Sequence, residues 1–354
     1  MIAPNPAAAR MIESSATELA ESACIQFLST QQSAEGTDMQ DSWSHHFRQR
    51  VLELSAAVAA GEPALFTARV MWSRQAMQAR YQESVALGDT LQSLRTVLNA
   101  ELPTESLGEA LACIDEAIGQ YSKEIPEFSV SMLDPGIATQ RLALLYLQSA
   151  LEGNVLEAME IVFDAIDDGL DPREAITKVL LYAQLEVGHL WHLDQVTIAE
   201  EHLVTSTTQR TMAVIADRTA RAPDRGKTAV CAAVASNPHE IGIRAIAYLL
   251  EMDGWRVVFL GPDVPRNDLP AAVHFFDADI ALLSMALSSQ LSRLQESITA
   301  IRQSCGERIR IMVGGNAFRD APDIWQRIGA DGFAPDAEEA LRLAIELTVD
   351  ESHH

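Results

Sequence analysis

The spacing of apolar residues divides the chain into a long helical portion and a shorter portion of a different texture. Up to about residue 221, apolar residues recur every three to four positions, which is typical of helices buried on one face. From residue 228 onward, short apolar runs alternate with amphipathic stretches. The pattern predicts a multidomain protein that is all-α at first and α/β afterwards.

The helical portion is divided by the segment 126–136, which contains two prolines and a glycine. We therefore predict a helical N-terminal domain over residues 1–130 and a second helical domain over residues 131–222. Four helices with short connections in the second domain indicate an antiparallel four-helix bundle. Its predicted helix N-caps are Asn154, Asp171 and Thr197, the last in a capping box with Glu200.

The portion from 226 to 350 contains five short apolar runs, each followed by a helical pattern. The predicted strands are 228–235, 255–261, 279–284, 309–315 and 331–335. This alternation predicts a doubly wound, parallel, five-stranded sheet of the Rossmann-like or flavodoxin-like kind. Ligands of such sheets bind outside the carboxyl ends of the strands, so the residues that follow each strand are the candidates for function.

Charge and cysteine content limit the possible partners. With 26 Lys and Arg against 50 Asp and Glu, the formal net charge is −24, which disfavours direct contact with nucleic acid or an anionic membrane. The four cysteines are scattered singly and form no zinc motif. No secretory signal or membrane-spanning stretch is apparent, so we expect a cytoplasmic protein.

The first strand end carries a histidine in the sequence "SNPHEIGIR", residues 236–244. No GxGxxG follows this strand, and no P-loop motif occurs, so a glycine loop that cradles phosphate is not expected. A lone histidine cannot build a zinc site, but His239 could give one axial bond to a metal that brings its own equatorial ligands. Ser284 and the pair Gly314 and Gly315 would leave a slot for a long, flat group.

These strand ends resemble those of cobalamin-binding Rossmann-like domains, whose signature is D-x-H-x-x-G followed by a serine strand and a Gly-Gly. The resemblance implies that His239 is the lower axial ligand of cobalt and that Gly242 lets a helix start close to the corrin. It also implies that Ser284, Gly314 and Gly315 line the slot for the nucleotide tail. Asn237 stands where the family has aspartate, so it can orient the imidazole but carries no charge.

The end of the bundle carries a second pattern, "WHLDQVTIAEEH", in which Trp191-His192 precede Glu201-His202. This W-x9-E-H spacing resembles the adenosylcobalamin light sensors of the CarH type, in which a helix bundle caps the upper face of the corrin. The resemblance implies that Trp191 packs against the adenosyl group, with Glu201 and His202 nearby. It further implies that His192 can bind cobalt after light expels the adenosyl group.

Residues 1–130 show no basic recognition helix of the MerR type. The architecture resembles the photocobilins, which pair a B12 photosensor module with a helical region that binds a bilin such as biliverdin. By that resemblance, Trp72, Arg74 and Tyr81 are candidates for a bilin site. Arginines and aromatic residues on a helix are, however, more often a solvated face over a core.

The sequence therefore favours a non-enzymatic B12 photoreceptor that acts in signal transduction. It would bind adenosylcobalamin and act through a homo-oligomer or a downstream protein partner. The alternative is a corrinoid carrier of a cobalamin-dependent methyltransferase system. Such a carrier is expected to have the aspartate of the D-x-H-x-x-G signature, and this chain has Asn237 at that position. A mutase subunit would need a substrate barrel. Cobalamin storage, or sensing without light, also stays open.

Overall fold

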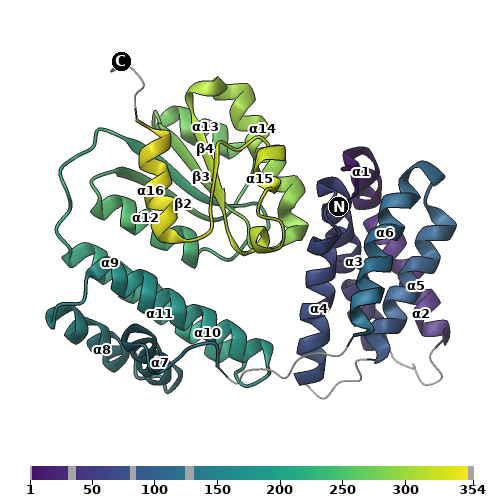
Figure 1. The fold of residues 1–354 in the computed structure, drawn as a ribbon, viewed down its shortest axis with the longest axis horizontal. Helices are drawn as coiled ribbons and strands as arrows, with labels where there is room; N and C mark the ends of the chain where they lie inside the picture. The colour runs from purple at the N-terminus through teal and green to yellow at the C-terminus, as the bar shows by residue number, and fades with distance from the viewer. Residues whose placement is uncertain (1, 31–36, 80–84, 124–130, 350–354) are drawn as a thin grey trace. The chain divides into compact units, whose positions relative to one another are not determined.

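The computed structural model describes residues 2–30, 37–79, 85–123 and 131–349 (Figure 1). The chain forms two compact units, each with its own packing. Unit 1 comprises residues 1–126, 287–292 and 317–327, and unit 2 comprises residues 127–286, 293–316 and 328–354.

Unit 1 is built from helices. Its N-terminal helices are α1(Pro6–Ser14), α2(Ala16–Thr30), α3(Thr37–Ala60), α4(Pro63–Ala79), α5(Val85–Glu101) and α6(Thr104–Tyr121). Asn5 caps α1 by accepting a hydrogen bond from the backbone N–H of Ala8 at 3.0 Å. Gly61 joins α3 to α4 with φ +67°, and a Cβ at this position would lie 2.6 Å from the Ile2 carbonyl oxygen. Only glycine fits this turn without displacing the backbone.

Unit 1 also includes two short segments from the last third of the chain, which contain the 3₁₀ turn η2(Ser288–Gln290) and α15(Ile324–Arg327). Gln49 donates a hydrogen bond to the Ser289 hydroxyl at 3.3 Å. Arg327 donates to the Ala60 carbonyl and pairs with Glu62. Residues far apart in sequence therefore complete this unit.

Unit 2 begins with the helical bundle. Its helices are α7(Ala138–Leu151), α8(Val155–Asp167), α9(Pro172–Glu174) continued through the π-helical turn η1(Ala175–Leu180) into α10(Leu181–His192), and α11(Ile198–Arg218). The predicted capping box is confirmed, since Thr197 and Glu200 exchange side-chain and backbone hydrogen bonds. Asp171 caps α9, whereas Asn154 occupies the N-cap position of α8 without a capping hydrogen bond.

The rest of unit 2 is a parallel five-stranded sheet. Its strands are β1(Thr228–Val234), β2(Arg256–Val264), β3(Ile280–Ser284), β4(Arg310–Gly314) and β5(Gly332–Ala334), in the order β2-β1-β3-β4-β5. All five predicted strands are confirmed, and so is the doubly wound fold. Every residue of β1 is buried, as expected for a central strand that is covered on both faces.

Helices cover both faces of the sheet: α12(Ile241–Met252) and α16(Ala337–Leu347) on one, α13(Asp268–Phe275) and α14(Leu291–Cys305) on the other (Figure 1). Helix α12 has two apolar sides. Ala245, Leu249 and Met252 belong to the core of the bundle, and Ile243 and Leu250 belong to the core of the sheet. The bundle and the sheet are thus joined by one shared helix within unit 2. The predicted limits of three separate domains stay a prediction.

None of the described helices combines the length and the apolar character that a bilayer span requires.

The capping box at Thr197 offers a test of the bundle. Thr197→Ala removes the acceptor for the Glu200 N–H, so we expect the free energy of unfolding of unit 2 to fall by about 1 kcal/mol. Thr299→Ala, at an exposed position within α14, is the matched control and should change it by less than about 0.5 kcal/mol. Urea unfolding followed by circular dichroism measures both, and equal effects of the two substitutions would contradict the assignment.

Candidate functional site

The candidate site lies at the carboxyl edge of β1 and β3. The chain leaves β1 toward β2 on one side of the sheet, and β3 lies on the other side of β1. This reversal of strand order opens a crevice that α/β proteins of this topology use for ligands. The loop after β1 carries Asn237, His239 and Glu240, and Ser284 ends β3.

Asn237 fixes the orientation of the His239 ring. Its side chain is 0% exposed, and its Nδ2 donates to the Ser284 carbonyl at 3.0 Å, which assigns Oδ1 as the acceptor. This Oδ1 accepts the backbone N–H of His239 and lies 3.2 Å from His239 Nδ1. Nδ1 must therefore donate at this contact, and the imidazole lone pair is on Nε2. Since His239 is exposed, that nitrogen belongs to a side chain that a ligand can approach.

Two residues with left-handed backbone hold this loop, and the sequence analysis gave neither a role. Ser236 has φ +63°, and Asp263, the next-to-last residue of β2, has φ +53°. The Ser236 N–H donates to Asp263 Oδ1 at 2.6 Å, and the Asp263 N–H donates to the Asn237 carbonyl at 3.1 Å. Strained conformations of this kind persist where neighbouring contacts enforce them, often at functional sites. These two hydrogen bonds join the loop after β1 to the end of β2.

The predicted slot residues lie on neighbouring strand ends. Ser284 and Gly314 are register partners of β3 and β4. A Cβ on Gly315, where φ is +112°, would lie 2.3 Å from the Met285 carbonyl oxygen, and one on Gly314 would lie 3.0 Å from the Ala334 carbonyl oxygen. The close approach of backbone segments within the sheet is therefore sufficient to require glycine at Gly315. The role of Ser284, Gly314 and Gly315 in lining a slot for the nucleotide tail stays a prediction.

Gly242 has a different environment. It is exposed in the first turn of α12, and a Cβ built on it would have no heavy atom within 4 Å in the part of the chain that the structure describes. Nothing in the fold of this helix requires glycine there. A side chain at this position, three residues after His239, would instead enter open space.

A polar network next to His239 joins the bundle to the sheet, and the sequence analysis missed it. Gln209 of α11 donates to Glu240 Oε1 at 2.7 Å, and Arg244 of α12 pairs with the same oxygen at 2.9 Å. Glu240 Oε2 and Arg244 Nε are buried and have no hydrogen-bond partner among the described residues. The signal was present in "HEIGIR", where an acid and a base stand four residues apart, a spacing at which they can pair at a helix start.

The four predicted cap residues lie at one helix connection. Trp191 and the buried His192, which is 5% exposed, end α10, and Glu201 and His202 lie in the first turns of α11. Glu201 accepts a hydrogen bond from Thr205 at 2.7 Å, while the His202 side chain is 70% exposed. The structure thus brings both pairs to the same end of the bundle. The roles implied for them stay predictions.

A chain of hydrogen bonds runs from Glu201 into the bundle. The Thr205 hydroxyl lies 2.7 Å from Glu201 and 2.9 Å from Gln184 of α10, and Gln184 donates to Thr208 at 2.9 Å. Thr208 and the buried Tyr146 of α7 are 2.9 Å apart. Burial raises the pKa of Tyr146, so this phenol is neutral and can donate. Beyond the Glu201 carboxylate, the chain connects three helices through hydroxyl and amide groups.

The residues predicted for a bilin lie in unit 1. Trp72 of α4 has the guanidinium of Arg69 over its ring, 4.5 Å from the centroid. Arg74 lies 4.6 Å from the centroid of the Tyr121 ring and donates to the Lys123 carbonyl at 2.8 Å. Tyr81 lies outside the described residues. The bilin site stays a prediction.

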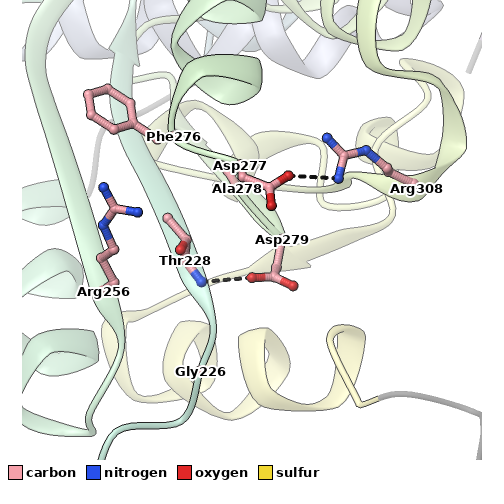
Figure 2. A pocket seen from close by; sticks show the side chains of 8 residues that line it. All are labelled: Gly226, Thr228, Arg256, Phe276, Asp277, Ala278, Asp279 and Arg308. Carbon is pink, nitrogen blue, oxygen red and sulfur yellow. Dashed lines mark hydrogen bonds and ion pairs between the residues drawn. The ribbon is translucent and has the colours of Figure 1, made fainter.

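A separate polar pocket lies at the opposite, amino edge of the sheet, and Figure 2 shows its side chains. Its acidic groups are engaged: Asp277 pairs with Arg308 at 2.9 Å, and Asp279 accepts the Thr228 N–H at 2.7 Å. Because ligands of such sheets bind at the carboxyl edge, we regard this pocket as structural.

No bare metal site is found among the described residues, and two of the buried thiols are unreactive. No group of three or more His, Cys, Asp or Glu side chains among them could hold a metal ion. Burial raises the pKa of Cys113 to about 12 and raises that of Cys231 as well, so both thiols stay protonated.

Comparison with known proteins agrees with this geometry. Residues 227–345 match a family model described as a B12 binding domain, and residues 145–216 match a second model with the same description. The fold of unit 2, a helical bundle followed by a Rossmann-like sheet, agrees with these two models. The matches support cobalamin as the group that residues 145–216 and 227–345 bind.

Individual relatives fall into two kinds. The chain is 31% identical over 173 residues to the HTH-type transcriptional repressor CarH of Myxococcus xanthus, covering 49% of this chain and 57% of CarH. It is 29% identical over 206 residues to the dimethylamine corrinoid protein 3 of Methanosarcina acetivorans, covering 56% of this chain and 92% of that protein. The chain thus spans little more than half the length of the CarH repressor.

A solved structure confirms the fold of unit 2. The monomethylamine corrinoid protein of Methanosarcina barkeri superposes with a TM-score of 0.50 at 20% identity, covering 59% of this chain and all of that protein.

The residues of the carboxyl edge fit a corrinoid on three observations. The lone pair of His239 is on Nε2 of an exposed ring. The space beside Gly242 is open. Glu240 Oε2 and Arg244 Nε are buried polar atoms that the described chain does not satisfy, and amide side chains of a corrin could satisfy them.

Gly242 gives the sharpest test of this fit. Gly242→Ala should leave the stability of the apoprotein unchanged or slightly higher, because its Cβ meets nothing and alanine favours the helix. If cobalamin occupies the space, its affinity should fall about tenfold or more. Gly108→Ala in α6, where a Cβ also meets no atom, is the matched control. Titration with hydroxocobalamin and thermal unfolding separate the two effects. Equal affinity in both variants would contradict the placement.

Asn237 provides a second test. Asn237→Ala removes the acceptor that sets the His239 tautomer, so the affinity for hydroxocobalamin should fall about 10- to 100-fold. It also leaves the Ser284 carbonyl without its donor, so the protein should lose about 1–3 kcal/mol of stability. Asn267→Ala, at an exposed N-cap position without a side-chain cap, should change neither. Unchanged cobalt ligation in Asn237→Ala would refute the orienting role.

Proposed function

We propose that the protein is a non-catalytic B12 photoreceptor that binds adenosylcobalamin between the helical bundle and the sheet of unit 2. The observation that carries this proposal is the polar contact between Gln209 of the cap and Glu240, the neighbour of His239. It means that a change at the cobalt ligand has a direct route to the bundle. The similarity to CarH and the W-x9-E-H pattern support light as the stimulus.

On the lower side, His239 would give Nε2 to cobalt while Asn237 holds Nδ1. The Asn237 amide is neutral, so it fixes the ring direction without adding negative charge behind the imidazole. Ser284, Gly314 and Gly315 would border the nucleotide tail at the ends of β3 and β4. Glu240 and Arg244 would meet polar groups at the rim of the corrin.

On the upper side, Trp191 would cover the adenosyl group, with Glu201 and His202 in the same connection. When bound, adenosylcobalamin supplies a cobalt–carbon bond that visible light breaks. His192 is buried at the end of α10, so its imidazole is held near this connection and excluded from water. It is the residue best placed in the sequence to act as a replacement ligand.

The output would be a change in packing between the cap and α12. Such a change shifts the balance of two states when one ligand form binds them unequally. We propose that a homo-oligomer or a downstream protein reads this change in the cytoplasm, as one step of signal transduction. The net charge of −24 disfavours direct binding of nucleic acid.

Biliverdin is proposed as a second chromophore, held in unit 1 near Trp72, Arg74 and Tyr81. What supports it is the resemblance to photocobilin architecture, together with the aromatic and cationic composition of α4.

A corrinoid carrier for a methyltransferase is the second candidate. It is favoured by the match to a dimethylamine corrinoid protein, which covers 92% of that protein. In this reading, a methyltransferase would be the partner of the chain, and the cap would open to give it access to the cobalt.

Illumination distinguishes the two candidates. The full-length protein, loaded with adenosylcobalamin in the dark, should change its absorption spectrum when exposed to green or blue light. Its oligomeric state in size-exclusion chromatography should change with it. In His239→Ala the dark spectrum should shift to that of a cobalamin without a protein lower ligand, while Trp191→Ala should alter the light response and keep the dark ligation.

His274→Ala, in the last turn of α13, is the control and should behave as wild type. A loaded protein whose ligation, assembly and spectrum are the same before and after light would refute the photoreceptor. Capture of methylcobalamin with transfer to a methyltransferase would instead support the carrier.

A further inference from the structure

The hydroxyl of Thr205 in α11 lies between two hydrogen-bond acceptors. Its Oγ1 is 2.7 Å from Glu201 Oε1 and 2.9 Å from Gln184 Oε1. A hydroxyl group carries one proton, so it can donate to one of these oxygens only. The Glu201 carboxylate accepts hydrogen bonds and donates none. As they stand, these three groups therefore lack one proton for the two short contacts.

Turning the Gln184 amide end over would supply that proton. In the structure, Nε2 of Gln184 donates to Thr208 at 2.9 Å and Oε1 faces Thr205. In the reversed orientation, Nε2 would donate to Thr205, and the proton of Thr205 would go to Glu201. Oε1 of Gln184 would then accept from Thr208. Because the oxygen and nitrogen of a glutamine amide occupy nearly the same space, both orientations fit between the two threonines.

The buried end of the chain accepts either direction. Burial raises the pKa of Tyr146, so the phenol keeps its proton, and it lies 2.9 Å from Thr208. It also hydrogen-bonds Thr211, whose own proton goes to the Thr207 carbonyl at 2.8 Å. The phenol can donate to Thr208 when Thr208 donates to Gln184, or to Thr211 when Thr208 donates to the phenol. Either orientation of the amide thus leaves the buried hydroxyls satisfied.

Neighbouring threonines of the same helix show that Thr205 is unusual. Thr207 and Thr211 each donate to the backbone carbonyl four residues earlier, at 2.8 Å. This is a common arrangement for a threonine inside a helix. Thr205 instead contacts the side chain of the residue four positions earlier, Glu201. A threonine that only filled space in the bundle would not need this contact.

Glu201 lies on the side of α11 that meets the His239 loop. Glu201, Thr205 and Gln209 follow one another at intervals of four residues, so they share one face of the helix. Gln209 of this face donates to Glu240, the residue that follows His239. The carboxylate of Glu201 therefore belongs to the face of the cap that is turned toward the carboxyl edge of the sheet.

The second oxygen of Glu201 is available to a ligand. Oε2 lies 3.6 Å from Nε2 of His202, which is longer than a hydrogen bond, and the His202 side chain is 70% exposed. The Glu201 side chain itself is 28% exposed. Ile198, one turn earlier on the same side of α11, is 60% exposed. A ligand that covered this apolar surface would also remove water from the carboxylate, which would then need a donor from the ligand.

We propose that Thr205 and Gln184 are positioning residues that hold Glu201 as a hydrogen-bond acceptor, so that the cap favours upper ligands of cobalamin that donate hydrogen bonds. With the Gln184 amide nitrogen on Thr205, the chain delivers one proton to Oε1 and leaves Oε2 for the ligand. The hydroxyl groups of an adenosyl ligand satisfy Oε2, whereas a methyl ligand has no donor to offer. The inference rests on the proposed function in one respect, the placement of the upper ligand next to Glu201.

The experiment compares adenosylcobalamin with methylcobalamin, each titrated into the full-length protein in the dark and followed by absorption. The measured quantity is the ratio of the two affinities. Thr205→Val keeps the size of the side chain and removes its proton. It should weaken adenosylcobalamin about 3- to 10-fold and leave methylcobalamin unchanged. Thr205→Ser keeps the hydroxyl and should restore the wild-type ratio. Ser206→Val, at the exposed neighbouring position of α11, is the matched control.

Gln184→Glu tests the direction of the chain. Its side chain has the same size but only accepts, so it competes with Glu201 for the proton of Thr205. It should lower the ratio of affinities at least as much as Thr205→Val does. Added to Thr205→Val, it should lower the ratio no further, because both substitutions act on the same proton. Thermal unfolding of each variant checks that it is folded, and the two Thr205 variants decide the proposal without Gln184→Glu.

Each outcome counts for or against the proposal. Equal ratios in wild type and Thr205→Val overturn it, and so does a loss that Thr205→Ser fails to restore or that Ser206→Val reproduces, since packing would then explain the effect. The light response of the wild-type protein is measured separately. A cobalamin-loaded protein without a light response refutes the photoreceptor, while the ratio still decides the role of Thr205. An unchanged ratio with an intact light response overturns this inference alone, and no binding of either cobalamin overturns both.

Discussion

The candidate site at the carboxyl edge of the sheet depends on the hydrogen bonds of the buried Asn237 amide. Its two ends have opposite hydrogen-bonding character: Nδ2 anchors to the carbonyl at the end of β3, and Oδ1 accepts from the loop that carries His239. The sheet therefore determines the orientation of the His239 ring, because the end of β3 holds the Asn237 amide and this amide holds the imidazole. An aspartate could hold the ring with charge as well as direction. The amide offers direction alone, so the basicity of His239 is left to its surroundings.

Helix α12 makes the cap and the sheet one folding unit. Its two apolar sides belong to two cores, and its first turn carries the polar contacts of Glu240 and Arg244. Movement of the bundle is therefore opposed by apolar packing along α12, whereas the polar junction near His239 is small and incompletely satisfied. The part of this interface with unsatisfied buried atoms lies next to the proposed cobalt ligand. A ligand that satisfies those atoms would favour one packing of the cap over another.

The sequence predicted those features that follow from local rules. The five strands, the capping box at Thr197 and the helix starts depend on periodicity and on nearby side chains, so they were correctly predicted. The strand-end position of His239 followed from the same rules. The Gln209–Glu240 contact joins residues 31 positions apart, and the unsatisfied atoms of Glu240 and Arg244 emerge only when burial is known. Gly315 illustrates the converse, since the sheet itself requires a glycine that the sequence suggested for a ligand.

The π-helical turn Ala175–Leu180 sets the direction in which the side chains at the end of α10 face. A π-turn is equivalent to one residue inserted into an α-helix, and each residue advances the helix by about 100°. Everything after the turn, including Trp191 and His192, has therefore been rotated by that angle relative to the first turns, which begin at Pro172. Deleting one residue from this turn would therefore rotate the indole and the imidazole by about 100° relative to the start of the helix, with the cap at Asp171 left intact.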